Sequence, residues 1–214
     1  MPRTGKMINL ARRLLKRIKK QKGVIYSCST KIAILGTSGV GKSTITRSFS
    51  VPNDYKKKRN SNTPTPSEIF QRTLLLKSND GTLCRHHLFL LDTPGAMRAD
   101  FPDIYKKTIE ICEAFVLVFS MDNKDSLIEL NDILKDIDLI KKTKYTPILV
   151  VANKKDRSPK HEATTNEQIA NINRGCCFLK TASDGYVDCF VKLLTLIEKR
   201  KGIDRPPSGV QLVF

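Results

Sequence analysis

The feature that most restricts the fold of this chain is the stretch Gly-Thr-Ser-Gly-Val-Gly-Lys-Ser at residues 36–43. It follows an apolar run at residues 31–35, typical of a buried strand, and it opens a helical pattern at residues 41–49. Glycines let such a loop curl until backbone N–H groups converge on a phosphate, and the helix N-terminus adds partial positive charge. The order strand, loop, helix therefore predicts a phosphate-binding loop, which we name the phosphate loop.

Within the phosphate loop, we expect Lys42 to reach the β- and γ-phosphates of a nucleotide and the Ser43 hydroxyl to ligate Mg²⁺. This motif alone fits ATP and GTP equally well. The candidate nucleotide-binding residues here are Gly36, Ser38, Gly39, Val40, Gly41, Lys42, Ser43 and Thr44.

A second loop, Asn153-Lys154-Lys155-Asp156, follows the apolar run at residues 147–152. Ligands of open α/β sheets bind at the carboxyl ends of the strands. A carboxylate there accepts two hydrogen bonds from the N1–H and N2–H₂ edge of guanine, which adenine does not offer, and a site built for such bonds rejects the wrong base. The loop favours guanine, with Asn153, Lys154 and Asp156 as candidates. Taken alone, it also fits an ordinary polar turn.

Strand and helix patterns alternate along the chain, which predicts an α/β fold with a mostly parallel six-stranded sheet flanked by helices. An Asn-Asp-Gly turn at residues 79–81 predicts a hairpin that supplies one antiparallel edge strand. The strands are expected at residues 31–35, 70–76, 84–91, 114–120, 147–152 and 176–179, and the helices at 41–49, 104–113, 126–141, 166–172 and 186–200.

These motifs, in this order, resemble those of Ras-superfamily small GTPases over residues 31–200. The resemblance includes Thr65 and the Asp-Thr-Pro-Gly stretch at residues 92–95, and residues 65–70 are similar to the effector segment of the Ras branch. It implies a P-loop NTPase with a Ras-like G domain, which binds GTP and GDP with Mg²⁺, hydrolyses GTP and acts as a molecular switch. Effectors and regulators would bind through residues 63–72 and 92–103, the first and second switch regions.

The resemblance also implies roles for single residues. Asp92 would hold Mg²⁺ through water, the Gly95 N–H would meet the γ-phosphate, and Thr65, with Thr63 as the alternative, would close over both. The implied catalytic residues are therefore Lys42, Thr65 and Gly95, and the implied metal ligands are Ser43, Thr65 and Asp92. Near the base, the resemblance implies contacts from Thr181, Ala182 and Ser183. Tyr55 and Phe49 are the candidates for stacking on the edge of the base, although the helical position of Phe49 favours core packing.

Three positions depart from the family's pattern. Residue 96, after Gly95, is alanine, whereas Ras-like proteins have a glutamine that orients the attacking water. We therefore expect slow hydrolysis, and either a signalling GTPase or a non-hydrolysing GTP-binding scaffold fits this substitution. Ser183 and Asp184 replace the usual Ala and Lys of the last nucleotide loop, which predicts weaker nucleotide binding.

Positive charge is concentrated at the N-terminal end. The net charge is +17, and residues 1–53 contain twelve Lys or Arg but no Asp or Glu. At helical periodicity, residues 6–20 divide into an apolar arc and a basic arc, and Gly23 would end that helix. It fits an anionic membrane surface or calmodulin, and it also fits nuclear import, a transit peptide or packing on the G domain. We divide the chain into a basic amphipathic extension (1–30), a G domain (31–200) and a tail (201–214).

No apolar stretch approaches the roughly 18 residues that a membrane span needs. The six cysteines form no C-x-x-C pair and only three histidines accompany them, so we expect reduced thiols in a cytoplasmic protein. Residue 2 is proline rather than glycine, so we expect no myristoylation, and no cysteine follows Cys189, so we expect no prenylation. The N-terminal helix is then the remaining candidate for peripheral attachment at the inner face of a membrane. We expect a monomer without specific nucleic-acid binding.

Overall fold

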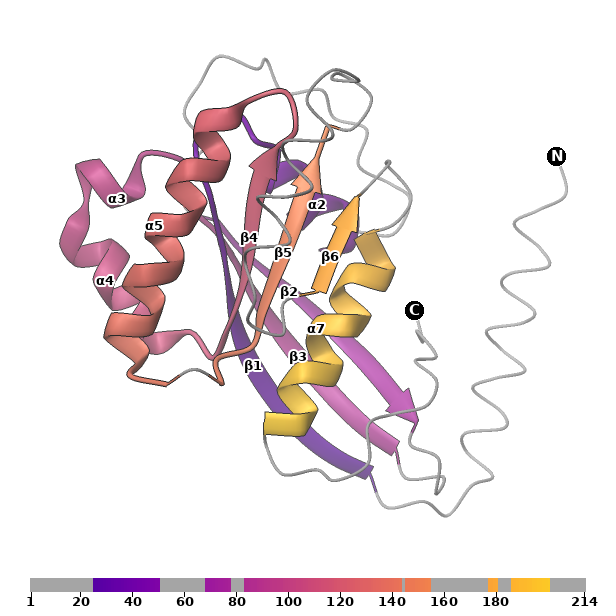
Figure 1. Cartoon of the computed structure of the whole chain (residues 1–214). Coiled ribbons are helices and arrows are strands. Elements are labelled where there is room, and N and C mark those ends of the chain that lie inside the picture. Colours follow the sequence, from indigo (N-terminus) through magenta and orange to yellow (C-terminus); the bar gives the residue numbers. More distant parts are fainter. Residues whose placement is uncertain are drawn as a thin grey trace, which may run out of the picture.

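The computed structural model describes residues 25–50, 68–77, 83–143, 145–154, 177–180 and 186–200. These residues form a six-stranded sheet in the order β2-β3-β1-β4-β5-β6, with helices on both faces (Figure 1). All neighbouring strands are parallel except β2, which pairs antiparallel with β3 at the edge. The predicted α/β fold is confirmed.

The strands are β1 (Ile25–Leu35), β2 (Glu68–Lys77), β3 (Leu83–Asp92), β4 (Ala114–Ser120), β5 (Ile148–Asn153) and β6 (Cys177–Lys180). The helices are α2 (Lys42–Ser50), α3 (Met97–Asp100), α4 (Pro102–Ile111), α5 (Lys124–Lys141) and α7 (Tyr186–Arg200).

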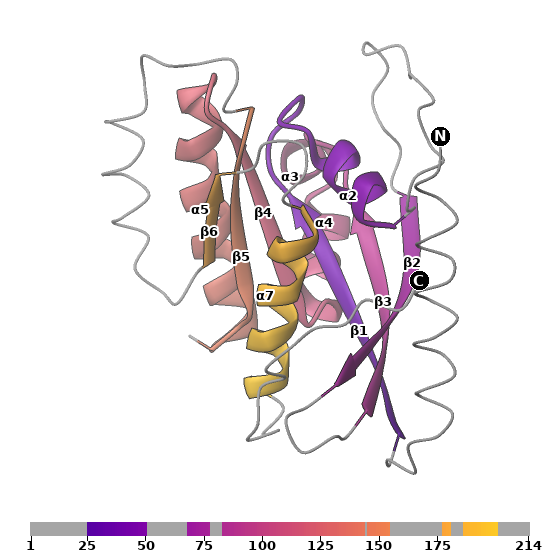
Figure 2. The same ribbon diagram turned by 90° about the vertical axis from the view of Figure 1, so that its right-hand side faces the viewer.

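Each face of the sheet carries its own apolar core. Strands β4 and β5 are buried at every position, as expected of central parallel strands covered on both sides. On one face α2 and α7 pack together, where the rings of Phe49 and Phe190 stack with centroids 3.7 Å apart. Helices α4 and α5 cover the other face (Figure 2). Phe49 is thus a core residue, as its helical position predicts.

Several elements begin earlier than the sequence pattern predicts. The first strand starts at Ile25 rather than residue 31, so residues 25–30 pair with β3 although the pattern placed them in the N-terminal extension. Helix α4 starts at Pro102, because a proline suits the first helical turn. Helix α5 starts at Lys124, because the Asn123 side chain accepts hydrogen bonds from the N–H groups of Asp125 and Ser126. The short helix α3 was not predicted.

Other predictions lie outside the described residues. They are the basic helix at residues 6–20, the turn at 79–81, the helix at 166–172 and the tail at 201–214. Among the helices that the structure describes, none is both long and apolar enough to cross a membrane.

Candidate nucleotide-binding site

The phosphate loop connects the end of β1 to α2, at the edge of the sheet where the parallel strands β4 and β5 also end (Figure 1). Gly36 has a φ of +143°, and a Cβ atom there would lie 2.1 Å from the carbonyl oxygen of Val118 in β4. Only glycine permits this approach without displacing β4. The phosphate loop therefore packs directly against β4, one of the two central strands of the sheet.

Lys42 is the first residue of α2 and is 6% exposed. Its ammonium group donates to the carbonyl oxygens of Gly36 (2.8 Å) and Thr37 (2.7 Å), which holds it across the mouth of the loop. Burial lowers the pKa of Lys42 to about 8, while the nearby carboxylates of Asp92 and Glu129 act in the opposite direction. A phosphate group bound in the loop would give this buried ammonium group an anionic partner.

Asp92 ends β3 and is fully buried. Within the described residues, neither carboxylate oxygen has a hydrogen bond of ordinary geometry. Burial raises the pKa of Asp92, whereas the Ser43 hydroxyl and the charges of Lys42 and Arg47 oppose that rise. A buried carboxylate without a full set of partners, next to a hydroxyl, fits a hard divalent cation such as Mg²⁺, which takes oxygen ligands. The residues present therefore fit the metal that the sequence predicts.

The second switch region starts against the phosphate loop. A Cβ atom on Gly95 would lie 2.3 Å from both the backbone nitrogen and the Cα of Ser38, so the two loops are in contact. The Thr93 hydroxyl donates to the carbonyl oxygen of Ile34 (2.6 Å) and fixes the segment to β1. Ala96 is exposed and precedes α3 without a side-chain cap, so this position contributes only a methyl group.

The segment after Ala96 is anchored to α5. Met97 is buried, and Arg98 and Tyr105 both contact the same carboxylate oxygen of Asp136, at 2.7 and 3.1 Å. Burial and the Asp136 charge raise the pKa of Tyr105, so its hydroxyl stays protonated and donates to Asp136. Nothing in the sequence pattern indicated this anchor, because Asp136 lies more than 30 residues further along the chain.

Asn153 connects the second loop to the phosphate loop. It ends β5, and its side-chain amide donates to the carbonyl oxygen of Val40 at 2.8 Å. Lys154 follows in the left-handed conformation (φ +59°), and its ammonium group lies 3.5 Å from Asp122. The sequence indicated Asn153 as a ligand of the nucleotide. It did not indicate the hydrogen bond from Asn153 to Val40, which joins the two loops within the chain.

The structure thus brings together the predicted phosphate-loop residues with Asp92, Gly95, Asn153 and Lys154. Tyr55, Thr63, Thr65, Asp156, Thr181, Ala182 and Ser183 lie outside the described residues.

Comparison with known proteins agrees with this geometry. The model of the Ras family matches residues 31–198. The chain belongs to the Ras family. The GTP-binding protein drn-1 of Caenorhabditis elegans is 32% identical over 80% of this chain and 76% of its own length. The GTP-binding protein Di-Ras2 of Pongo abelii is 33% identical over 84% of this chain and 86% of its own length, and human Di-Ras1 is 31% identical over 85% and 89%. This Ras-family chain is accordingly a guanine-nucleotide-binding switch protein.

Proposed function

We propose that this Ras-family chain is a Mg²⁺-dependent signalling switch that hydrolyses GTP slowly and therefore stays in its GTP-bound form for long periods. The observation that carries the proposal is Ala96, an exposed residue directly after Gly95. In Ras a glutamine at this position orients the water that attacks the γ-phosphate. The methyl group of an alanine makes no hydrogen bond to that water. Slow hydrolysis follows from the loss of that orientation.

The metal would be held by Ser43 and Asp92, together with Thr65 from outside the described residues. When bound, Mg²⁺ supplies positive charge that neutralises the β- and γ-phosphates. Lys42 adds a second positive charge from the protein side, and the backbone N–H groups of the phosphate loop orient the phosphate oxygens. This division of roles is supported by the burial of Lys42 and Asp92 around one loop.

The test is single-turnover GTP hydrolysis by the purified full chain. We expect a rate below the roughly 10⁻⁴ s⁻¹ of Ras, and an increase of about tenfold or more in the Ala96→Gln variant. Ala99→Gln is the matched control, because Ala99 is an exposed alanine of α3, three residues after Ala96. A wild-type rate equal to that of ordinary Ras proteins contradicts the proposal, because another group would then position the water.

A GTP-binding scaffold without useful catalysis is the second candidate, and the same residue supports it. If neither the wild type nor Ala96→Gln hydrolyses GTP while both bind it, the scaffold replaces the slow switch. Binding is measured separately, by the fluorescence of a labelled guanine nucleotide.

For effectors, we propose that the first switch region uses the open edge of the sheet. Its described part belongs to β2, an edge strand on which Ile69 is 66% exposed. An edge strand offers unpaired backbone groups to a partner strand. The second switch region supplies the other half of this surface.

We further propose that residues 6–20 attach the protein to an anionic membrane surface. The support is sequence charge alone: each basic residue near such a surface adds about 1 kcal/mol. In sedimentation with phosphatidylserine vesicles, the full chain should pellet, and a chain lacking residues 1–22 should stay in solution. Equal pelleting by both would contradict membrane attachment through this segment, and binding of calmodulin instead would identify the other partner.

A further inference from the structure

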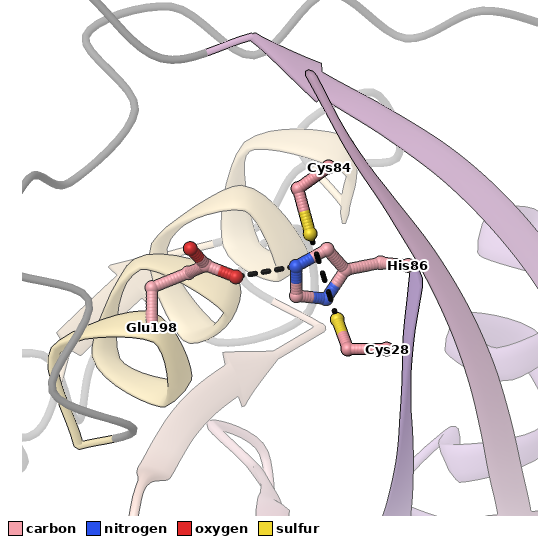
Figure 3. Close-up of side chains that lie close together, drawn as sticks. All are labelled: Cys28, Cys84, His86 and Glu198. Atoms are coloured by element: carbon pink, nitrogen blue, oxygen red, sulfur yellow. Dashed lines mark hydrogen bonds and ion pairs between the residues drawn. The ribbon is translucent and has the colours of Figure 1, made fainter. Parts of the chain in front are cut away.

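Four side chains that commonly bind metals meet far from the nucleotide site (Figure 3). Cys28 lies in β1, Cys84 and His86 in β3, and Glu198 in α7. Cys28 precedes Gly36 by eight residues of extended chain, or roughly 25 Å at strand spacing. The cluster is therefore separate from the site that would hold Mg²⁺.

The register of the sheet explains why these residues meet. β1 and β3 are parallel neighbours in which Cys28 is paired with His86, and Cys84 is two positions before His86. Because side chains alternate along a strand, residues two apart project from the same face. Helix α7 covers that face and contributes Glu198 near its C-terminal end. One ligand atom from each of the four residues lies within 4.8 Å of all the others.

The cluster is buried and polar. The side chain of His86 is fully buried and that of Glu198 is 4% exposed, and the two form an ion pair through Nε2. Figure 3 shows the Sγ atom of Cys28 beside the other ring nitrogen of His86. The Glu198 carboxylate and the Cys28 thiol are thus the groups that face the two ring nitrogens. Burying such groups costs free energy unless they are fully paired or bind a metal.

The donor set and its spacing fit Zn²⁺ better than other common divalent ions. The two sulfur atoms lie 3.7 Å apart, well beyond the 2.05 Å or so of a disulfide bond. Two sulfurs that each lie about 2.3 Å from one tetrahedral Zn²⁺ are about 3.8 Å apart, which agrees with the observed separation. Sulfur and imidazole donors favour Zn²⁺ over Mg²⁺ and Ca²⁺, which take oxygen ligands.

We propose that Cys28, Cys84, His86 and Glu198 form a structural zinc site that fastens α7 to the β1–β3 pair. Binding releases the thiol protons of both cysteines to solvent, since the thiolate is the ligand. His86 coordinates as the neutral imidazole, so the imidazolium that forms the ion pair with Glu198 also releases its proton to solvent. The Glu198 carboxylate turns from His86 to the ion and supplies the fourth ligand. All four positions are then filled, which is typical of structural zinc sites.

The experiment measures metal in the full chain, purified under reducing conditions with Zn²⁺ supplied and GDP and Mg²⁺ present. Elemental mass spectrometry should find one zinc ion per chain. Replacement by Co²⁺ should give the near-ultraviolet sulfur-to-cobalt absorption and the strong visible bands of a tetrahedral site. The sulfur-to-cobalt band distinguishes this site from the nucleotide site, where the expected ligands are oxygens.

Cys28→Ser and Cys84→Ser should each lower zinc affinity by about 100-fold or more, since losing even an outer partner of a ligand costs 10- to 100-fold. Cys112→Ala is the matched control, because Cys112 is buried in the core on the other face and should leave zinc binding unchanged. Glu198→Gln keeps the size of the side chain, and its cobalt complex should be weaker with altered visible bands even if the cysteine variants fold poorly.

Two results would overturn the proposal. One is a wild-type chain that, under reducing conditions, holds no zinc and gives no sulfur-to-cobalt band. The other is equal zinc binding by Cys28→Ser and Cys112→Ala.

Discussion

Replacing Gly36 by alanine is expected to destabilise the protein by about 3 kcal/mol and to abolish measurable nucleotide binding. The φ of +143° is one that L residues rarely adopt, and the new Cβ atom would lie 2.1 Å from the Val118 carbonyl oxygen. Relief requires either the loop or β4 to shift, and both belong to the site. Urea unfolding measures the loss of stability, and fluorescence titration with a labelled GDP measures binding.

Gly39→Ala separates the backbone strain of a positive φ from the steric clash with β4. Gly39 also has a positive φ, +75°, but a Cβ atom there would meet no atom within 4 Å. Its substitution should therefore cost only the backbone strain, about 1 kcal/mol. Equal destabilisation by both substitutions would show that contact with β4 is not what fixes the loop.

The second large effect is expected from Asp92→Asn, which should act in opposite directions on stability and on binding. Burial disfavours the ionised carboxylate, so removing its charge should stabilise the metal-free, nucleotide-free protein by about 1 kcal/mol. The same change removes the proposed anionic partner of Mg²⁺. The increase in nucleotide affinity that Mg²⁺ produces should fall by about 100-fold.

Two measurements check this trade-off: urea unfolding in a chelator, and nucleotide release rates with and without Mg²⁺. Asp100→Asn is the control, because Asp100 is exposed on α3 and should change neither quantity appreciably. If Asp92→Asn retains the full response to Mg²⁺, then Asp92 is a structural acid and the metal is held elsewhere.

The fold was largely predictable because the central strands are short apolar runs that alternate with segments of helical periodicity. The start of β1 was not predictable by the same rule. Residues 27–30 are Ser-Cys-Ser-Thr, which lacks the apolar alternation of a strand, and only pairing with β3 makes them extended. Local sequence does not report a partner strand that lies more than 50 residues away.

The nucleotide site was predictable to the extent that each motif is one continuous loop. The phosphate loop needed only local spacing and a strand to precede it, whereas the roles of residues 92–95 came from the resemblance to Ras-superfamily GTPases. The contacts between loops, such as Asn153 with Val40, depend on strand order and were not indicated. The cluster around His86 was missed for the same reason, because its ligands come from three separated elements and share no sequence spacing.

The anchoring of Arg98 and Tyr105 on Asp136 has a consequence for recognition. These contacts fasten α3 and the start of α4 to α5. A partner that binds α3 and α4 therefore loses little conformational entropy on binding.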